Sequence, residues 1–307
     1  MKLLLNLSMI IFLLQRSQSF LPKVKIQKNN VVLNSSKATA PSKGSLALIG
    51  SGPGDPELLT IKALKALKNA NLVIADRLVS KEILDLIQCE IKVARKNPGC
   101  AEEAQTEIYE WIKKGLDDGR NVVRLKIGDP FIFGRGGEEL LEARKWGIEC
   151  EVIPGISSIF SAPLLAGIPL THRSVANQVV LGTGYSKDYG TPDISAYHPE
   201  QTSVFLMAVG RLRQLTENLV ELGYPPLTPV AIVENASLPN QRCIIGDLSN
   251  IFEISTKFKV KAPATIIVGE VVRVTHGNNQ GLVQDCLNEK HCSMVLKFVG
   301  NNLQVVQ

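Results

Sequence analysis

Three glycine-rich turns are the first places in this sequence where chemistry is expected. They read GSGPGD at residues 50–55, GDPFIFGRGG at 128–137 and PGISS at 154–158, and each follows a short apolar run and precedes a segment with helical periodicity. The carboxyl end of a strand is where α/β folds place their ligands. The apolar residues at 131–133, set between glycines, fit a pocket wall better than a solvated turn. We therefore expect the three turns to converge on one crevice.

The first turn resembles the start of a dinucleotide-binding fingerprint, and Asp76 lies near the place where the ribose-binding acid of that motif would stand. The match fails at the third glycine, which is replaced by Asp55. A carboxylate at this helix N-terminus opposes the binding of an anionic pyrophosphate. The turn therefore points to another ligand, or to a simple reversal of the chain.

The elements that carry these turns alternate short apolar runs with amphipathic segments, a pattern that predicts an α/β fold with a mostly parallel sheet. Strands are expected at residues 46–49, 72–75, 91–94, 122–126, 151–153 and 178–181. Helices are expected at residues 56–68, 101–118, 136–146 and 157–166, the first with Asp55 as N-cap and Pro56 at its first position.

A second unit is expected after the polar stretch that follows Gly182. Its strands are predicted at residues 203–207, 230–233, 242–245 and 265–268, with a helix at 212–222. The predicted organisation is a leader at 1–44, an N-terminal α/β domain at 45–182, a C-terminal α/β domain at 183–275 and an appended tail at 276–307.

Charge and cysteine usage narrow the function classes. The formal net charge is +5, but residues 1–54 contain Lys and Arg and no acidic residue, so the excess belongs to the leader and not to a nucleic-acid-binding surface. The six cysteines are scattered without CxxC pairs, which predicts no disulfide framework. Cys286, His291 and Cys292 lack a fourth ligand, so no metal site is predicted.

The N-terminus has the anatomy of a signal peptide: Lys2, then an apolar run at residues 3–14, then small polar residues before Phe20. The run is shorter than the roughly 20 residues that span a bilayer, so no membrane association is expected once the leader is removed. The stretch up to Gly44 has the composition of a transit peptide. Together they resemble a bipartite leader and predict a plastid location; the alternative is a secreted protein with a disordered start.

Six runs carry a resemblance to the uroporphyrinogen-III C-methyltransferases, within the tetrapyrrole methylase family. In order they are GSGPGDPELLTIKA, ADRLVS, RLKIGDPFIFGRGGEE, IPGISS, AGIPLTHR and TPVAIVENAS followed by QR, and they cover residues 45–273. One motif alone would indicate only the wider family, which includes other precorrin methyltransferases, diphthine synthase and an rRNA ribose methyltransferase. RLKxGDPFxFGRGGEE together with PLTHR is much more specific.

The resemblance implies two α/β domains with the active site in the cleft between them. It implies that Asp76 is the proton acceptor and Lys96 the proton donor. It also implies an S-adenosylmethionine site, with no metal, formed by Pro53, Ile127, Gly128, Asp129, Ile132, Ser157, Ser158, Met207 and Ala236.

The sequence departs from the family pattern at five positions. These are Ala75, Arg95, Ile127, Tyr185 and Ala236, where the family usually has Tyr, Gly, Gly, His and Gly. Backbone contacts tolerate most of these changes. Arg95 leaves open which of two neighbouring bases acts as the donor. For Asp76 itself, the alternative is a turn residue paired with Arg77.

The implied reaction is two successive methylations of uroporphyrinogen III, giving precorrin-2 for siroheme. The substrate carries carboxylates, for which Arg is the preferred partner. Candidates beside the motifs are Arg77, Arg95, Arg135, Arg173 and Arg211, each of which also fits a solvated surface charge.

The expected partners are the small tetrapyrrole, a second copy of the chain in a homodimer, and a separate precorrin-2 dehydrogenase/ferrochelatase downstream. Nucleic acid is not expected as a partner. Two alternatives remain: the same fold acting on another substrate, and a non-catalytic protein that senses S-adenosylmethionine or a tetrapyrrole.

Overall fold

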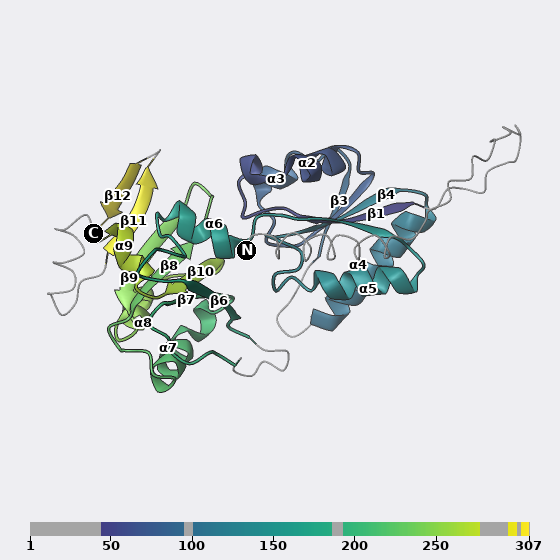
Figure 1. Ribbon diagram of the computed structural model, residues 1–307. Helices are drawn as coiled ribbons and strands as arrows, with labels where there is room; N and C mark the ends of the chain where they lie inside the picture. Colours follow the sequence, from purple (N-terminus) through teal and green to yellow (C-terminus); the bar gives the residue numbers. More distant parts are fainter. Residues whose placement is uncertain (1–43, 95–100, 186–192, 277–293, 300–301, 307) are drawn as a thin grey trace, which may run out of the picture. The chain divides into compact units, whose positions relative to one another are not determined.

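The computed structural model describes residues 44–94, 101–185, 193–276, 294–299 and 302–306 (Figure 1). The chain separates into two units, residues 1–40 and 41–307, and all described residues belong to the second. The expected leader, apart from Gly44, and the candidates Arg95 and Lys96 lie outside the described residues. Among the residues that are described, no helix is long and apolar enough to cross a membrane.

The first sheet has five strands, all parallel, in the order β3-β2-β4-β1-β5. The strands are β1 (Ser45–Gly50), β2 (Leu72–Ala75), β3 (Glu90–Val93), β4 (Asn121–Lys126) and β5 (Cys150–Ile153). Because the strands are parallel, the turns after β1, β2, β4 and β5 all leave from one edge of the sheet. The expectation of a parallel α/β sheet is confirmed for this part of the chain.

Helices cover both faces of this sheet (Figure 1). On one face α2 (Ile61–Lys68) and α3 (Lys81–Leu84) pack on a core that includes Ile49 and Val123. On the other, α4 (Ala101–Asp117) packs on a core that includes Leu46 and Val122, and α5 (Gly136–Lys145) contributes Ala143 to it. Side chains that alternate along each strand thus supply two cores.

The helix expected at residues 56–68 is two elements. The short 3₁₀ helix η2 (Pro56–Leu58) begins at Asp55, whose carboxylate accepts a hydrogen bond from the Glu57 amide. The backbone is then extended at Leu59 and Thr60, and α2 begins only when the Thr60 hydroxyl accepts a hydrogen bond from the Ala63 amide. A second capping residue therefore restarts the helix.

The second sheet has seven strands in the order β12-β11-β9-β8-β10-β7-β6. Its strands are β6 (Gln178–Thr183), β7 (Gln201–Leu206), β8 (Pro229–Glu234), β9 (Arg242–Asp247), β10 (Ala264–Val268), β11 (Met294–Val299) and β12 (Asn302–Val306). Only β6 and β7 pair in parallel; the other neighbours are antiparallel. The expectation of a mostly parallel sheet is wrong here.

Strand pairing also changes the expected domain organisation. The predicted boundary after residue 182 puts this strand in the first domain, but β6 pairs with β7 along six residues and so belongs to the second sheet. Within the expected tail, β11 pairs with β9 and extends the same sheet. Periodicity identified where most strands lie, but it carries no information on which strands pair.

Helices again cover both faces of the second sheet. One core contains residues of α6 (Ser158–Leu165) and α9 (Val271–His276), and the other contains residues of α7 (Leu212–Glu221) and α8 (Ile251–Lys257). The short 3₁₀ helix η3 (Val209–Arg211) leads into α7.

Candidate active site

The three glycine-rich turns meet at the carboxyl edge of the first sheet. Gly52 and Gly128 exchange backbone hydrogen bonds of 3.2 and 2.9 Å, which ties the turn after β1 to the turn after β4. The Gly155 amide donates to Asp129 Oδ2 at 3.4 Å, which ties in the turn after β5. The predicted convergence of the three turns is therefore confirmed.

Glycine is required at these contacts because the backbones approach too closely for a side chain. A Cβ at Gly50 would lie 2.5 Å from both the Gly128 oxygen and the Gly155 nitrogen, and a Cβ at Gly155 would collide with the same Gly128 oxygen. Gly128 itself has a φ of 66°, in the region that favours glycine. Bare backbone at this edge allows a ligand to approach it closely.

The residues expected to hold S-adenosylmethionine fall into two groups. Pro53, Ile127, Gly128 and Asp129 lie in the first two turns. Ile132 follows in the second turn, while Ser157 caps α6 and Ser158 is its first residue. Asp129 is held in place because its Oδ1 accepts a 2.8 Å hydrogen bond from the Phe131 amide.

The second group, Met207 and Ala236, follows strands of the second sheet. β10 pairs antiparallel with both β7 and β8, so Met207 and Ala236 leave the same edge of that sheet. Met207 is exposed and has a φ of 56°, whereas Ala236 is buried. The strand directions therefore place Met207 and Ala236 at one edge of the second sheet.

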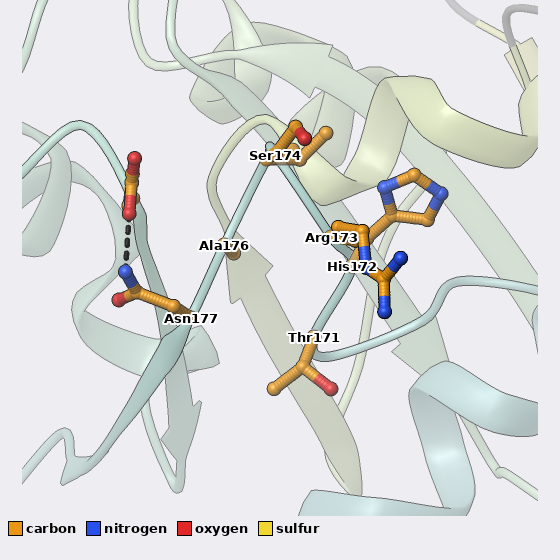
Figure 2. Close-up of a pocket in the computed structure, with 8 residues that line it drawn as sticks. Thr171, His172, Arg173, Ser174, Ala176 and Asn177 are labelled. Carbon is orange, nitrogen blue, oxygen red and sulfur yellow. Dashed lines mark hydrogen bonds between the residues drawn. The ribbon is translucent and has the colours of Figure 1, made fainter.

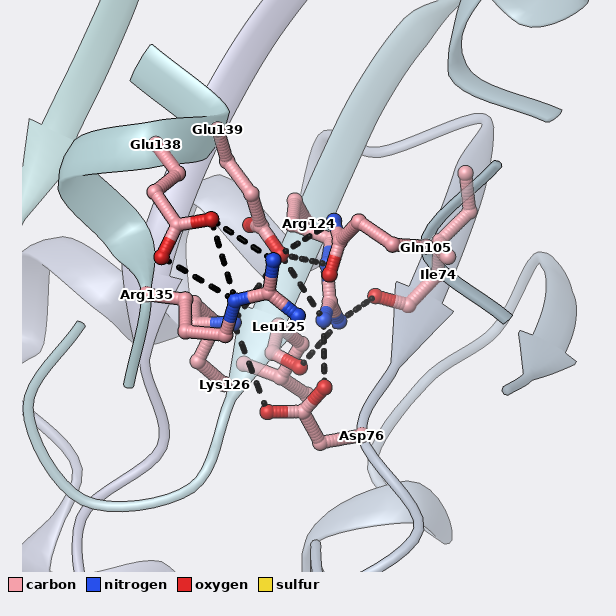
Figure 3. Close-up of polar contacts among 9 residues, drawn as sticks. All are labelled: Ile74, Asp76, Gln105, Arg124, Leu125, Lys126, Arg135, Glu138 and Glu139. Carbon is pink, nitrogen blue, oxygen red and sulfur yellow. Dashed lines mark hydrogen bonds and ion pairs between the residues drawn. The ribbon is translucent and has the colours of Figure 1, made fainter. Parts of the chain in front are cut away.

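Asp76, the candidate proton acceptor, ends β2 beside a buried pair of cations (Figure 3). Arg124 Nη2 donates to Asp76 Oδ1, and Lys126 Nζ lies 3.6 Å from Asp76 Oδ2. Both cations also contact Glu139 Oε1, with Lys126 Nζ at 3.0 Å and Arg124 Nη2 at 3.2 Å. We call Asp76, Arg124, Lys126 and Glu139 the buried quartet.

Sheet geometry explains why the quartet forms. Val122, Arg124 and Lys126 alternate along β4 and so point to one face, the face that α4 and α5 cover. Glu139 comes from α5, and Gln105 of α4 donates its Nε2 hydrogen to Glu139 Oε1 at 3.2 Å. Parallel pairing sets Arg124 opposite Ile74, so its guanidinium reaches Asp76 two residues further on.

Burial and charge act against each other on the two cations. Burial lowers the pKa of Arg124, but the charges of Asp76 and Glu139 outweigh burial and raise the pKa overall. For Lys126 burial comes first and the neighbouring charge of Arg124 second, and together they lower its pKa despite the two carboxylates. Arg124 therefore keeps its proton, whereas Lys126 holds its proton less firmly than an exposed lysine does.

The quartet was only partly visible in the sequence. Asp76 was a candidate, but its partners Arg124, Lys126 and Glu139 were not. The signal that was missed is the pair of bases within the otherwise apolar strand at residues 121–126. A charged residue inside a strand that is buried on both faces requires a partner.

The candidate substrate-binding arginines are in different environments. Arg77 is exposed, and Arg135 pairs with Glu138, Nη2 to Oε2 at 2.6 Å, a hydrogen bond that raises the pKa of Arg135. Arg211 stacks on the Tyr185 ring with its guanidinium carbon 4.3 Å from the ring centre.

Arg173 is exposed and lines a surface pocket formed by residues 171–177 and Glu200 (Figure 2). The Glu200 carboxylate also accepts a hydrogen bond from the side-chain Nδ2 of Asn177 within this pocket. The pocket therefore presents both a cation and a carboxylate.

Comparison with known proteins gives these residues a context. Residues 45–251 match the family of tetrapyrrole (corrin/porphyrin) methylases. The chain belongs to the tetrapyrrole methylase family. Among the described residues of this family member, no group of three or more His, Cys, Asp or Glu side chains is placed to hold a metal ion.

Similar proteins narrow the likeness within the family. A probable uroporphyrinogen-III C-methyltransferase of Schizosaccharomyces pombe is 44% identical over 80% of this chain, which spans only 50% of that relative. The uroporphyrinogen-III C-methyltransferase of Methanocaldococcus jannaschii is 44% identical over 75% of this chain and 98% of its own length. A solved uroporphyrin-III C-methyltransferase of Thermus thermophilus, complexed with S-adenosyl homocysteine, is 40% identical with a TM-score of 0.66, over 75% of this chain and 94% of that one.

Proposed function

We propose that this chain is an S-adenosylmethionine-dependent C-methyltransferase that converts uroporphyrinogen III to precorrin-2 by two successive methylations, in siroheme biosynthesis. The observation that carries the proposal is the position of Asp76. Its carboxylate lies at the edge of the first sheet that also bears the three glycine-rich turns, in a chain 44% identical to the M. jannaschii enzyme over 98% of that enzyme. Family membership supports the reaction type, and the buried quartet supports the proton transfer.

The turns fit a methyl donor of this kind. Gly52 and Gly128 have positive φ and no side chain, so an adenosyl or methionine group can approach their backbone. The T. thermophilus relative was solved with the demethylated form of that donor, which supports the assignment. When bound, the donor supplies an electrophilic methyl group on a sulfonium.

The protein's own task is then positioning and proton transfer. The pyrrole carbon bonds to the methyl, the sulfur–methyl bond breaks with its electrons staying on sulfur, and the macrocycle becomes cationic. It returns to neutrality by losing a proton, which the Asp76 carboxylate accepts as general base. The donor role implied for Lys96 stays a prediction, because residue 96 lies outside the described residues.

The substrate would be recognised through its carboxylates. Arg77, Arg135 and Arg173 are exposed on turns that follow or adjoin the site residues. Bidentate pairing with a guanidinium suits carboxylates better than contact with a lysine does. Arg211 is held against Tyr185 and has a restricted orientation, which favours it as a fixed contact.

The test is to incubate the full chain with S-adenosylmethionine and anaerobically prepared uroporphyrinogen III, and to follow product mass and S-adenosylhomocysteine. A mass gain of two methyl groups is expected. If uroporphyrinogen III gains no methyl group but another precorrin is methylated, that precorrin replaces uroporphyrinogen III as the proposed substrate. Binding of S-adenosylmethionine without any methyl transfer would favour a sensor.

The matching variant is Asp76→Asn, which keeps the shape of the side chain and removes its charge. We expect methyl transfer to fall by about 100-fold or more, in the range that a general base contributes, with S-adenosylhomocysteine binding retained. Asp118→Asn, at an exposed aspartate, is the control. Undiminished methylation in a folded Asp76→Asn protein would remove Asp76 from the reaction.

Three further proposals follow from the resemblance and the leader. The chain acts in the plastid, as a homodimer, upstream of a separate precorrin-2 dehydrogenase/ferrochelatase. Fusion of residues 1–44 to a fluorescent protein tests the first, and sedimentation equilibrium of the chain tests the second. Turnover of the chain's product to siroheme by an added dehydrogenase/ferrochelatase tests the third.

A further inference from the structure

The buried quartet contains more charge than a base alone requires. Its side chains are 1% exposed for Arg124, 3% for Lys126, 4% for Glu139 and 18% for Asp76. Removing such charges from water costs several kcal/mol each, and apolar residues in their place are often at least as stable. Buried ionisable clusters of this kind are characteristic of functional sites. Asp76 is the most exposed member and so the one that a substrate can reach.

Each oxygen of Asp76 faces a different cation. Oδ1 accepts a hydrogen bond from Arg124, while Oδ2 forms an ion pair with Lys126, at 3.6 Å. Lys126 Nζ lies closer to Glu139 Oε1, at 3.0 Å, so the same ammonium is shared between two carboxylates. Its influence on Asp76 therefore depends on Glu139 as well.

With all four groups ionised, the quartet holds two cations and two carboxylates and its charges balance. A proton accepted by Asp76 leaves an excess positive charge in a site of low polarity, where charge interactions are strong. Arg124 does not lose its proton under these conditions. Lys126 is thus the cation whose charge can respond to the state of Asp76.

We propose that Lys126 is a positioning residue for Asp76: its ammonium sets the pH at which Asp76 takes up a proton, and so sets the strength of Asp76 as proton acceptor. This role rests on the proposed methyl transfer. Burial first, and then the charge of Arg124, lower the pKa of Lys126, so its ammonium holds its proton less firmly than that of an exposed lysine.

Among the described residues, the charged groups that face Lys126 come from three elements. Asp76 is at the end of β2, Arg124 is on β4 and Glu139 is on α5. Behind Glu139, α4 contributes Gln105 and Tyr109, and Arg135 and Glu138 lie at the start of α5. In the described part of the chain, Glu139 Oε2 and Gln105 Oε1 are buried without a hydrogen-bond partner, and the charge of Glu139 also raises the pKa of Arg135.

The test measures Asp76 directly. The full chain, labelled with ¹³C at aspartate carboxyl groups, is titrated by NMR, and Asp76→Asn assigns the signal. In Lys126→Met the titration midpoint of Asp76 should move up by about one pH unit or more, because an opposite charge that favours the ionised form is lost. Lys126→Arg, which keeps the charge, should restore the midpoint. Wild-type Asp76 could stay ionised over the whole pH range in which the protein is folded. In that case a titration midpoint that becomes visible only in Lys126→Met counts as the same upward shift.

A second variant gives the opposite sign. Glu139→Gln removes the carboxylate that competes for Lys126, so the midpoint of Asp76 should move down. General damage to the fold would not shift the titration midpoint of Asp76 in opposite directions in the two variants. Lys145→Met on α5 is the control, because its side chain is 71% exposed and pairs with Glu142. An unchanged midpoint in both Lys126→Met and Glu139→Gln, with S-adenosylhomocysteine binding intact, overturns the proposal.

Kinetics separate this role from a structural one. The acid limb of the pH profile for kcat should shift upward in Lys126→Met by the same amount as the NMR midpoint, with activity recovered at higher pH. A uniform loss at every pH would overturn the proposal. If the wild-type chain transfers no methyl group, the proposed function fails, while the NMR titration still decides whether Lys126 controls Asp76.

Discussion

The two sheets bury charge in different ways. In the first, Arg124 of the buried quartet contacts Asp76, 48 positions away in the sequence, and Glu139, 15 positions away. Parallel strands bring such distant segments to one edge of the sheet. In the second, Glu234 and Arg242 are direct neighbours across the antiparallel pair β8 and β9, eight positions apart. The first arrangement depends on the whole sheet, and the second on a single hairpin.

The difference extends to what each charge group does. Arg242 Nε donates to Glu234 Oε2 at 2.5 Å, and the Lys261 amide donates to Glu234 Oε1 at 2.5 Å. This closes the loop that contains Ala236, while the carboxylate itself stays buried. The buried quartet instead leaves one carboxylate, Asp76, partly exposed. Each group has one member that is more exposed than the rest, Asp76 at 18% and Arg242 at 32%. In the quartet that member is a carboxylate, which can accept a proton, whereas in the hairpin pair it is a guanidinium, which stays charged.

The comparison is most strongly tested at Arg124. Arg124→Met removes one of the two cations of the buried quartet, and removing one partner of a buried pair costs about 3–5 kcal/mol of unfolding free energy. Urea denaturation measures the change. Arg124→Met combined with Glu139→Gln should recover part of it, because the net charge is restored. A cost below about 1 kcal/mol would show that the quartet is hydrated and not a buried cluster.

The fold of the first sheet was largely predictable from sequence. Apolar runs bounded by Gly, Pro and Asp located all five strands, and a parallel arrangement followed from the helices between them. The interruption at Leu59 and Thr60 was missed because both residues fit the helical periodicity. Only the observed cap at Thr60 shows that the chain restarts there.

The second sheet was less predictable for a physical reason. Its strands also read as short apolar runs, and an apolar run does not state whether its neighbour is parallel or antiparallel. The short helices α3, α8 and α9 have four to seven residues and too few turns to show periodicity. For the candidate site, motif position predicts Asp76, but its partners depend on the strand register that sets Arg124 opposite Ile74.

The next largest effect is expected where backbones meet in the first sheet. Gly155→Ala places a methyl group against the Gly128 carbonyl and the Gly50 backbone, which cannot move aside, and overpacking of this kind costs about 1–3 kcal/mol. S-adenosylhomocysteine affinity, measured by calorimetry, should fall as well.

The two glycine controls connect this result to the second sheet. In Gly246→Ala on β9 the new methyl group would meet the ends of the Asn250, Ile254 and Ile251 side chains, which can shift, so a smaller cost is expected and no change in affinity. Gly137→Ala on α5 meets nothing within 4 Å and should be neutral or stabilising. If Gly155→Ala and Gly246→Ala lowered the free energy of unfolding equally, the backbone at the turns of the first sheet would be packed no more tightly than the side chains around Gly246 in the second sheet.

The smallest of the three effects is expected at the hairpin pair of the second sheet. Arg242→Met leaves Glu234 buried, but the Lys261 amide still binds one of its oxygens, and the Arg242 side chain is already 32% exposed, so water can replace it. We expect a loss of about 1–2 kcal/mol in urea denaturation, less than the 3–5 kcal/mol of a fully buried pair. Lys81→Ala, at a pair with side chains 82% and 60% exposed, should not move the midpoint at all. Arg242→Met could instead lower the free energy of unfolding as much as Arg124→Met does. The larger number of charges in the buried quartet would then add no stability beyond that of one cross-strand pair, and the two sheets would differ in geometry alone.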